Sequence, residues 1–268
     1  MLKPPMNQLK ELYRYRYFIL TSILTEFRSK FARSRLGGMW MILHPLAQVA
    51  IYALILSAVL SAKLPGIDNR YAYAIYLMAG MLGWSLFAEV LSRSLSIFVD
   101  NGNLLKKVMF PKMALPLTMV GSALISNTLL FAAILFVFAA LGHLPSWHIV
   151  WIPFLLLVSM ALGLGLGLIA GILNVFMRDV SQIVPIFIQF WFWLTPVVYA
   201  STIIPPQYLK WVMLNPMAGV VMGFQDVLVY QKTPQFGTLL YPLLISVVSL
   251  LLAAFMIRRA SEEMVDML

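Results

Sequence analysis

The side chains that could perform acid–base or metal chemistry are few and scattered along this chain. It has ten acidic residues, three histidines and no cysteine. The lack of cysteine excludes disulfides, thiolate metal sites and cysteine nucleophiles. His44, His143 and His148 show no ligand spacing with carboxylates. We therefore predict no catalytic residue, no metal site and no cofactor bound by this chain, and nothing points to a nucleic-acid partner.

Basic and aromatic side chains, by contrast, occur in groups. The first 36 residues are rich in arginine and lysine, and the loop at residues 100–112 has Lys106 and Lys107 close to an apolar Leu104–Leu105 step. Aromatic residues gather around residues 84–87 and 190–199. Tryptophan and tyrosine commonly form belts at bilayer interfaces, and basic residues contact anionic headgroups.

Composition predicts that membrane-spanning helices hold these groups in place. Apolar residues make up 62% of the 268 residues and charged residues only 11%, against roughly 25% charged residues in a soluble globule. A helix needs about 20 apolar residues to cross the hydrocarbon core. We predict an all-α integral membrane protein of one domain, 1–268, with spans at 39–62, 71–92, 116–141, 149–176, 181–200 and 239–257.

The N-terminal segment 1–36 is predicted to be an amphipathic helix on the membrane surface. Apolar residues recur there at helical spacing, with basic residues largely between them: Leu20, Ile23, Leu24, Phe27 and Phe31. Such a helix lies in the interface with its basic residues toward anionic headgroups. It could only anchor the first span or could also handle a substrate.

Two further segments are predicted not to span. The loop 100–112 begins with Asp100 and Asn101, which can cap a helix, and ends near Pro111, a pattern that suits a short surface helix offering apolar residues to a partner. The alternative is a basic loop that only fixes the topology. Segment 205–229 is too short and too interrupted by proline and glycine to cross, which predicts short re-entrant helices at the outer mouth.

Two patterns inside the spans have structural interpretations. Glu89 lies four residues before Arg93, the spacing of an ion pair along a helix, although an acid within a membrane helix is also a functional candidate. Gly163, Gly167 and Gly171 recur every four residues, which favours close helix packing. We expect that packing within the subunit, with a dimer face as the alternative.

The distribution of basic residues predicts that both termini are cytoplasmic. With that orientation, 15 of the 19 lysines and arginines lie inside and four lie outside. The outside four are Lys63, Arg70, Lys210 and Lys232. Cytoplasmic loops carry the excess of basic residues in multispanning proteins.

Several local motifs, in this order and on these loops, resemble a known family. They are residues 33–40 (RSRLGGMW) leading into 43–46 (LHPL), 103–111 (NLLKKVMFP), 174–180 (NVFMRDV), 193–199 (WLTPVVY) and 215–216 (NP). Together they resemble the ABC-2 type exporter permeases, in the branch that exports O-antigen, capsule and teichoic acid polymers. The resemblance covers nearly the whole chain.

The resemblance implies a function and an assembly. Such permeases form homodimers with a central pore in the bacterial inner membrane, and each subunit pairs with a separate cytoplasmic ATPase that binds ATP and magnesium. The loop after the second span would be the coupling helix, with Asn103, Leu104, Leu105, Lys106 and Lys107 at the ATPase. This chain has no Gly-Lys dipeptide and thus no phosphate-binding P-loop.

The implied substrate is a polysaccharide carried on a polyprenyl diphosphate. Arginine presents a planar fork of donors that suits phosphate, so the basic residues of the N-terminal helix are candidate contacts for the diphosphate. They are Arg14, Arg16, Arg28, Lys30, Arg33 and Arg35. Flat rings stack on sugars, so a subset of aromatic residues is expected to line the channel: Trp84, Phe87, Trp191, Trp193 and Tyr199.

Three other functions are weighed against this one. A drug or small-lipid exporter of the same superfamily would share the fold. A membrane-embedded transferase acting on lipid-linked sugars would need clustered carboxylates or histidines, but the two outer acids, Asp68 and Asp226, are far apart in the sequence. A secondary transporter more often has related halves and buried ionisable residues, and neither is prominent here.

Overall fold

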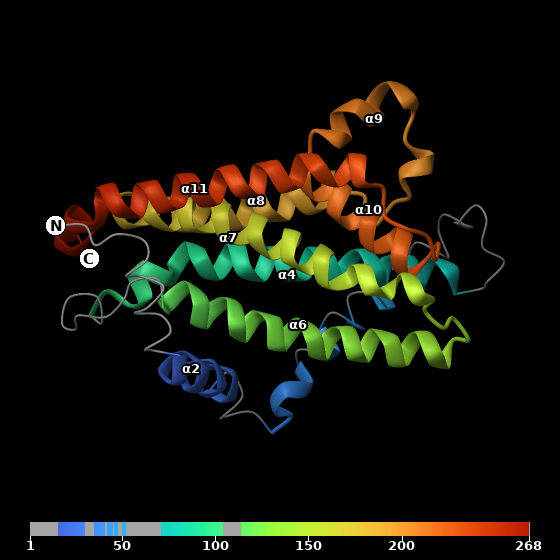
Figure 1. Ribbon diagram of the computed structural model, residues 1–268, viewed down its shortest axis with the longest axis horizontal. Coiled ribbons are helices and arrows are strands. Elements are labelled where there is room, and N and C mark those ends of the chain that lie inside the picture. Colours follow the sequence, from blue (N-terminus) through green and yellow to red (C-terminus); the bar gives the residue numbers. More distant parts are fainter. Residues whose placement is uncertain are drawn as a thin grey trace.

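The computed structural model is an all-helical bundle over the residues that it describes (Figure 1). These residues are 16–29, 35–40, 42–44, 46–47, 50–51, 71–103 and 114–267. The predicted first span, 39–62, lies largely outside them, as do most of segment 1–36 and most of loop 100–112. The described chain begins with α2 (Arg16–Ser29) and a short 3-10 turn, η1 (Gly37–Met39).

Four of the described helices are long and apolar enough to cross a membrane. They are α4 (Ala72–Asp100), α6 (Ala114–Ala140), α7 (Ile152–Phe176) with its leading turn η2 (Trp147–Trp151), and α11 (Phe236–Met267). They coincide with four of the six predicted spans. The break between α6 and α7 falls at the predicted Gly/Pro turn, where Gly142 takes a left-handed φ of 73°.

The predicted span at 181–200 differs from the structure in length. Helix α8 (Val180–Leu194) has 15 residues and ends at Leu194, so it is about 22 Å long at 1.5 Å per residue. Thr195 is extended because it precedes Pro196, and the proline ring disfavours helical backbone at the residue before it. The chain then forms the 3-10 turn η3 (Ser201–Ile203).

The segment 205–229 forms two short helices at the end of the bundle opposite the C-terminus (Figure 1). Helix α9 (Pro206–Met213) projects from the bundle, whereas α10 (Pro216–Leu228) lies among the long helices and is almost wholly buried. Asn215 separates them and caps α10, because its side-chain Oδ1 accepts a hydrogen bond of 2.9 Å from the backbone N–H of Met217.

The centre of the fold is the contact between α4 and α7. Gly163, Gly167 and Gly171 face the backbone of α4, and a Cβ at Gly167 would lie only 2.9 Å from the Leu91 carbonyl oxygen. Gly165 faces α11 on the other side of α7. The glycine pattern therefore serves packing within the subunit, as expected, and it sets α7 tightly between two neighbours.

Helices α4, α7 and α11 run in one direction, while α6 and α8 run in the other (Figure 1). Apolar side chains are buried around α4 and exposed on the outer helices; Phe136 on α6 is 76% exposed and Leu251 on α11 is 66% exposed. An apolar outer surface of this kind is suited to lipid or to another membrane subunit.

Candidate functional site

The carboxyl-terminal end of α4 leads directly into the predicted coupling segment. Helix α4 continues beyond the predicted limit of residue 92 to Asp100, and Gly102 and Asn103 are again helical. Asn103 is exposed at this end of the bundle. The other predicted contacts, Leu104, Leu105, Lys106 and Lys107, lie outside the described residues, so their role stays a prediction.

Arg93 connects three helices two turns before that end. Its guanidinium pairs with Glu26 of α2 and with Glu89 of α4, the latter at 3.4 Å. It also donates a 3.2 Å hydrogen bond to the backbone carbonyl of Met119 on α6. The predicted pair of Glu89 and Arg93 is confirmed. Sequence reasoning did not predict that Glu26 pairs with Arg93. The available signal was the presence of an acidic residue in an otherwise basic N-terminal segment.

Helix α2 lies against α6 and has an exposed apolar side. Ile23 packs over Gly121, where the absence of a side chain makes room for it. Leu20 and Leu24 are 57% and 52% exposed. Ile23 thus faces the protein, and the other two face outward, which suits a helix at the membrane surface.

The predicted diphosphate contacts are only partly described. Arg16 is half-buried, with its guanidinium 4.9 Å from the ring centre of Tyr17, a cation–π distance. Arg35 is exposed. Arg14, Lys30 and Arg33 lie outside the described residues, and for Arg28 only the helical backbone is described. The structure brings none of these residues together at a described site, so the diphosphate role stays a prediction.

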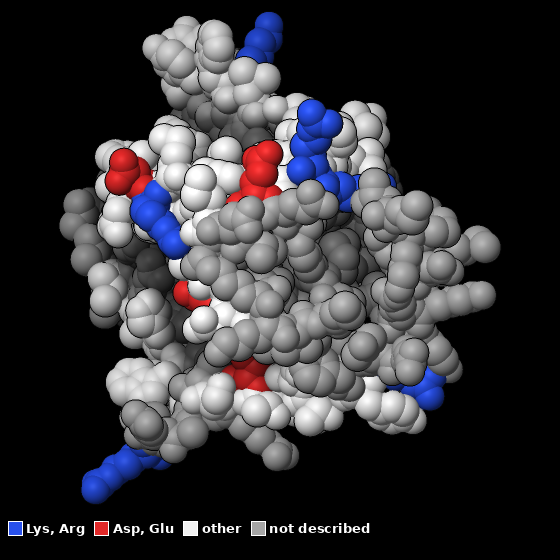
Figure 2. Space-filling view, turned by 90° about the vertical axis from the view of Figure 1, so that its left-hand side faces the viewer, with Lys and Arg blue, Asp and Glu red and all other residues white. Residues whose placement is uncertain are grey.

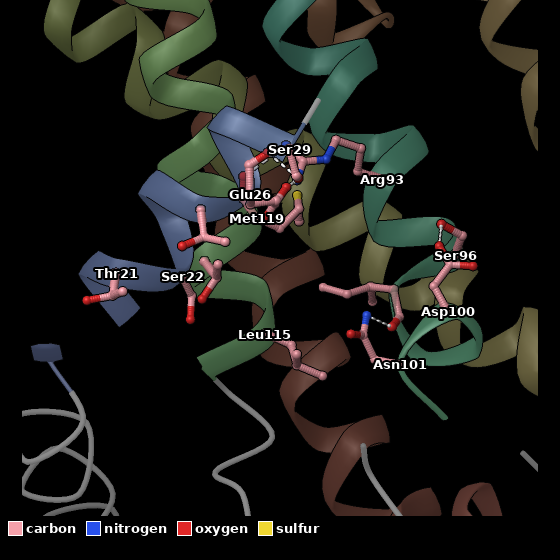
Figure 3. Close-up of a pocket in the computed structure, with 13 residues that line it drawn as sticks. Thr21, Ser22, Glu26, Ser29, Arg93, Ser96, Asp100, Asn101, Leu115 and Met119 are labelled. Carbon is pink, nitrogen blue, oxygen red and sulfur yellow. Dashed lines mark hydrogen bonds and ion pairs between the residues drawn. The ribbon is translucent and has the colours of Figure 1, made fainter. Parts of the chain in front are cut away.

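A cavity of about 650 Å³ opens between α2, α4 and α6 beside Arg93 (Figure 3). Glu26 and Arg93 lie together on one side of it, and Asp100 and Asn101 lie at the end of α4. Most of its other lining side chains carry hydroxyl groups. Sequence spacing could not find this cavity, because one of its walls, α2, is far in the sequence from the other two, α4 and α6.

The predicted channel aromatics divide between the core and the surface. Phe87 is fully buried and Trp84 is 6% exposed. Trp84 lies 5.4 Å from Phe87 between ring centres, and Phe87 lies 5.0 Å from Trp191. Trp84 and Phe87 thus pack against other side chains inside the described subunit, and their place at the channel also stays a prediction. Trp193 is 53% exposed; for it, Trp191 and Tyr199, a place at the channel stays a prediction.

Polar side chains hold the non-helical segment that follows α8. The hydroxyl of Tyr73 donates to the Val198 carbonyl at 2.5 Å, and that of Tyr76 donates to the Tyr199 carbonyl at 3.1 Å. Gln225 of α10 donates to the Pro196 carbonyl at 2.8 Å. These bonds satisfy carbonyl groups that no helix satisfies, which irregular backbone inside a membrane protein requires.

Asn215 ties this segment to the short helices. It accepts a 2.7 Å hydrogen bond from the indole N–H of Trp191 and donates one of 2.8 Å to Thr195. Sequence reasoning singled out residues 215–216 only as part of a motif. An asparagine directly before a proline is typical of a helix N-terminus, and this signal could have predicted that Asn215 caps α10.

Beyond α10, Asp226 forms an ion pair with Lys232 at 3.2 Å. Burial raises the pKa of the Asp226 carboxyl above its usual value, and the ammonium group of Lys232 opposes this rise. The pair lies at the end of the bundle away from Arg93, where it fixes the turn between α10 and α11.

Fold and site together define a helical membrane protein whose long helices meet a polar, charged junction at one end. The chain belongs to the ABC-2 type transporter family, whose match covers residues 17–229. The match includes α2, the long helices as far as α8, and both short helices α9 and α10.

The chain also matches curated relatives along most of its length. It is 28% identical to the O-antigen export system permease protein RfbA of Myxococcus xanthus, over 96% of this chain and 97% of that protein. It is 29% identical to a protein of the same name from Klebsiella pneumoniae, over 78% and 80%. It is 22% identical to the polysialic acid transport protein KpsM of Escherichia coli, over 90% and 92%.

Proposed function

We propose that this chain is the membrane-spanning permease subunit of an ATP-driven polysaccharide exporter. The observation that carries the proposal is the end-to-end match to the Myxococcus xanthus O-antigen permease. The relative from Escherichia coli, named for polysialic acid transport, supports the same class of cargo. The cargo proposed here is an O-antigen-like polymer linked to a polyprenyl diphosphate.

A separate ATPase supplies the energy in this proposal, and it binds ATP and magnesium. Its contact is the segment 100–112, with Asn103, Leu104, Leu105, Lys106 and Lys107 at the interface. Support comes from α4, which carries Arg93 and ends at Asp100, inside this segment, followed by the exposed Asn103. Two copies of the chain, with two ATPase subunits, would enclose the pore.

The orientation in the bacterial inner membrane follows from charge. Figure 2 shows basic and acidic side chains spread around the end of the bundle where α4 and α11 finish. Described basic residues at this end include Arg178, Arg258 and Arg259, while Lys210 and Lys232 belong to the opposite end. The positive-inside rule favours placing the first end in the cytoplasm.

Deletion of the gene in the native cells tests the proposal. We expect surface polysaccharide to disappear while full-length lipid-linked polymer accumulates inside the cells, and a plasmid-borne copy should restore export. Surface staining and immunoblots of fractionated membranes measure both pools. Unchanged surface polymer would contradict the proposal, and a failure to make polymer at all would favour the transferase.

A further inference from the structure

The cavity between α2, α4 and α6 has a lining that is rich in hydrogen-bond acceptors. Six hydroxyl side chains from all three helices face it: Thr21, Ser22, Thr25, Ser29, Ser96 and Thr118. Ser29 donates its hydroxyl proton to the Glu26 carbonyl, Ser96 to Asp100 and Thr118 to the Ala114 carbonyl, at 2.8, 2.5 and 2.9 Å. The oxygens of these three hydroxyl groups therefore offer lone pairs to a ligand.

The nitrogen donors of the described lining side chains, on Arg93 and Asn101, are already engaged. Arg93 is paired with Glu26 and Glu89 and bonds the Met119 carbonyl. The side-chain amide of Asn101 donates to the Ile97 carbonyl at 2.8 Å, so its oxygen remains as an acceptor. Among the described lining residues, the charged groups are one cation, Arg93, and two anions, Glu26 and Asp100, a sum of −1. These described residues do not suit a phosphate group, which favours positive charge.

A polyhydroxylated ligand fits this chemistry, because each of its hydroxyl groups can donate to a lining acceptor. The volume of about 650 Å³ lies within the ~300–1,000 Å³ that is usual for small-ligand sites. The apolar side of α2 would place the cavity at the level of a sugar headgroup. Leu20 and Leu24 on the outer side of α2 are exposed for contact with lipid, and a helix of this kind rests among the headgroups.

We propose that this cavity binds a saccharide unit near the lipid end of the exported polymer. The inference rests on the proposed function and adds a sugar-binding site to it, distinct from the basic residues expected to meet the diphosphate. The site lies next to Asp100 and Asn101, where α4 runs toward the coupling segment. A bound sugar would therefore contact the same helix that the ATPase moves.

Single cysteines test this directly, because the chain has none of its own. Thr25→Cys places a benzophenone maleimide at the cavity, and Leu251→Cys places it on the exposed apolar face of α11 as the control. Both variants are made in the full-length chain in native cells that synthesise the polymer and carry an ATPase without hydrolytic activity. After illumination, we expect a polysaccharide-positive adduct of high mass at Thr25→Cys, at least threefold above Leu251→Cys.

Acceptor removal makes the test specific. Thr118→Val combined with Ser96→Ala should lower the adduct yield at least threefold, since both variants remove lone pairs from the cavity. Thr128→Val is the matched control: it lies on the same helix and bonds the carbonyl four residues earlier at 2.8 Å in the same way, but it does not line the cavity. The control should leave the adduct unchanged.

Other occupants give other outcomes, and each would overturn the proposal. Adducts to phospholipid alone would mean that the cavity holds ordinary headgroups. An adduct that Asp100→Asn abolishes and the hydroxyl variants leave intact would indicate an amine or a cation. Mild acid distinguishes the two forms of captured sugar, because it cleaves the bond between sugar and diphosphate, which only the lipid-linked form has. Only capture of the lipid-linked form supports the proposal. If no sugar is captured in these cells, while cells with the same Thr25→Cys variant and an active ATPase export polymer normally, this inference fails and the exporter function stands.

Discussion

Arg93 is the residue whose surroundings say most about this protein. A charge near the end of an apolar helix is costly unless it is paired. Arg93 meets two carboxylates and a backbone carbonyl from three different helices. It therefore fixes α2 to the end of α4 that leads to the predicted coupling segment.

We predict that Arg93→Met destabilises the protein by about 1–3 kcal/mol, because it removes the cation that Glu26 and Glu89 share. Arg93→Lys keeps the positive charge and should therefore lose less stability than Arg93→Met. Thermal unfolding of the purified protein in detergent measures the change. Glu26→Gln should lessen the cost of Arg93→Met, and strictly additive effects of the two changes would contradict the pairing.

Asp226 gives a prediction on pH. Its pKa is raised by burial, so the folded state holds the proton more tightly than the unfolded state does. Its contribution to stability is then greatest below the pKa of the unfolded state and is lost as the pH rises through the folded pKa. Asp226→Asn should therefore raise the melting temperature at pH 7, and its advantage should shrink toward pH 4. A lower melting temperature at pH 7 would show that the Lys232 pair outweighs burial.

At the scale of the elements, the close contact of α4 and α7 depends on glycine. We predict that Gly167→Ala destabilises the bundle by about 1–3 kcal/mol, because the added Cβ would lie within 2.9 Å of the Leu91 carbonyl oxygen and the helices must separate. Gly237→Ala on α11 is the control, since nothing lies within 4 Å of its Cβ position. Equal melting temperatures for the two variants would contradict this packing.

Helix lengths show how far sequence alone could go. Long apolar stretches predicted α6 and α7 nearly at their limits, and Gly142 marked the break between them. Helix α11, predicted to end at 257, continues to Met267. The early end of α8 was missed, although Thr195 before Pro196 was a visible stop signal. Helix limits are predictable because the residues that set them lie within or next to the helix itself.

Contacts between distant segments were less predictable. Hydrophobicity alone could not tell that Phe87 is buried and Trp193 exposed, since both lie on apolar helices. The pairing of Glu26 with Arg93, and the cavity beside it, depend on how α2 rests on α6. That placement is a property of the tertiary fold, and no periodic pattern in the sequence indicates it.

At the scale of the whole molecule, the proposed exporter needs a partner at the end of α4. We predict that changing Leu104, Leu105 and Lys106 together to alanine abolishes copurification of the ATPase in mild detergent, because the apolar and basic contacts are lost. Arg258→Ala with Arg259→Ala, at the same end of the bundle, should retain it. Retention of the ATPase by the triple variant would place its binding surface elsewhere.

The most direct test of the account is transport itself. Inverted inner-membrane vesicles that contain this chain, its ATPase and lipid-linked polymer would be treated with a glycosidase that digests only polymer on the outside. We predict that ATP makes the polymer resistant to digestion, and that vesicles without this chain, or with a nonhydrolysable ATP analogue, show no such protection. If ATP is hydrolysed in the complete vesicles and the polymer stays fully digestible, this chain is not the export pathway.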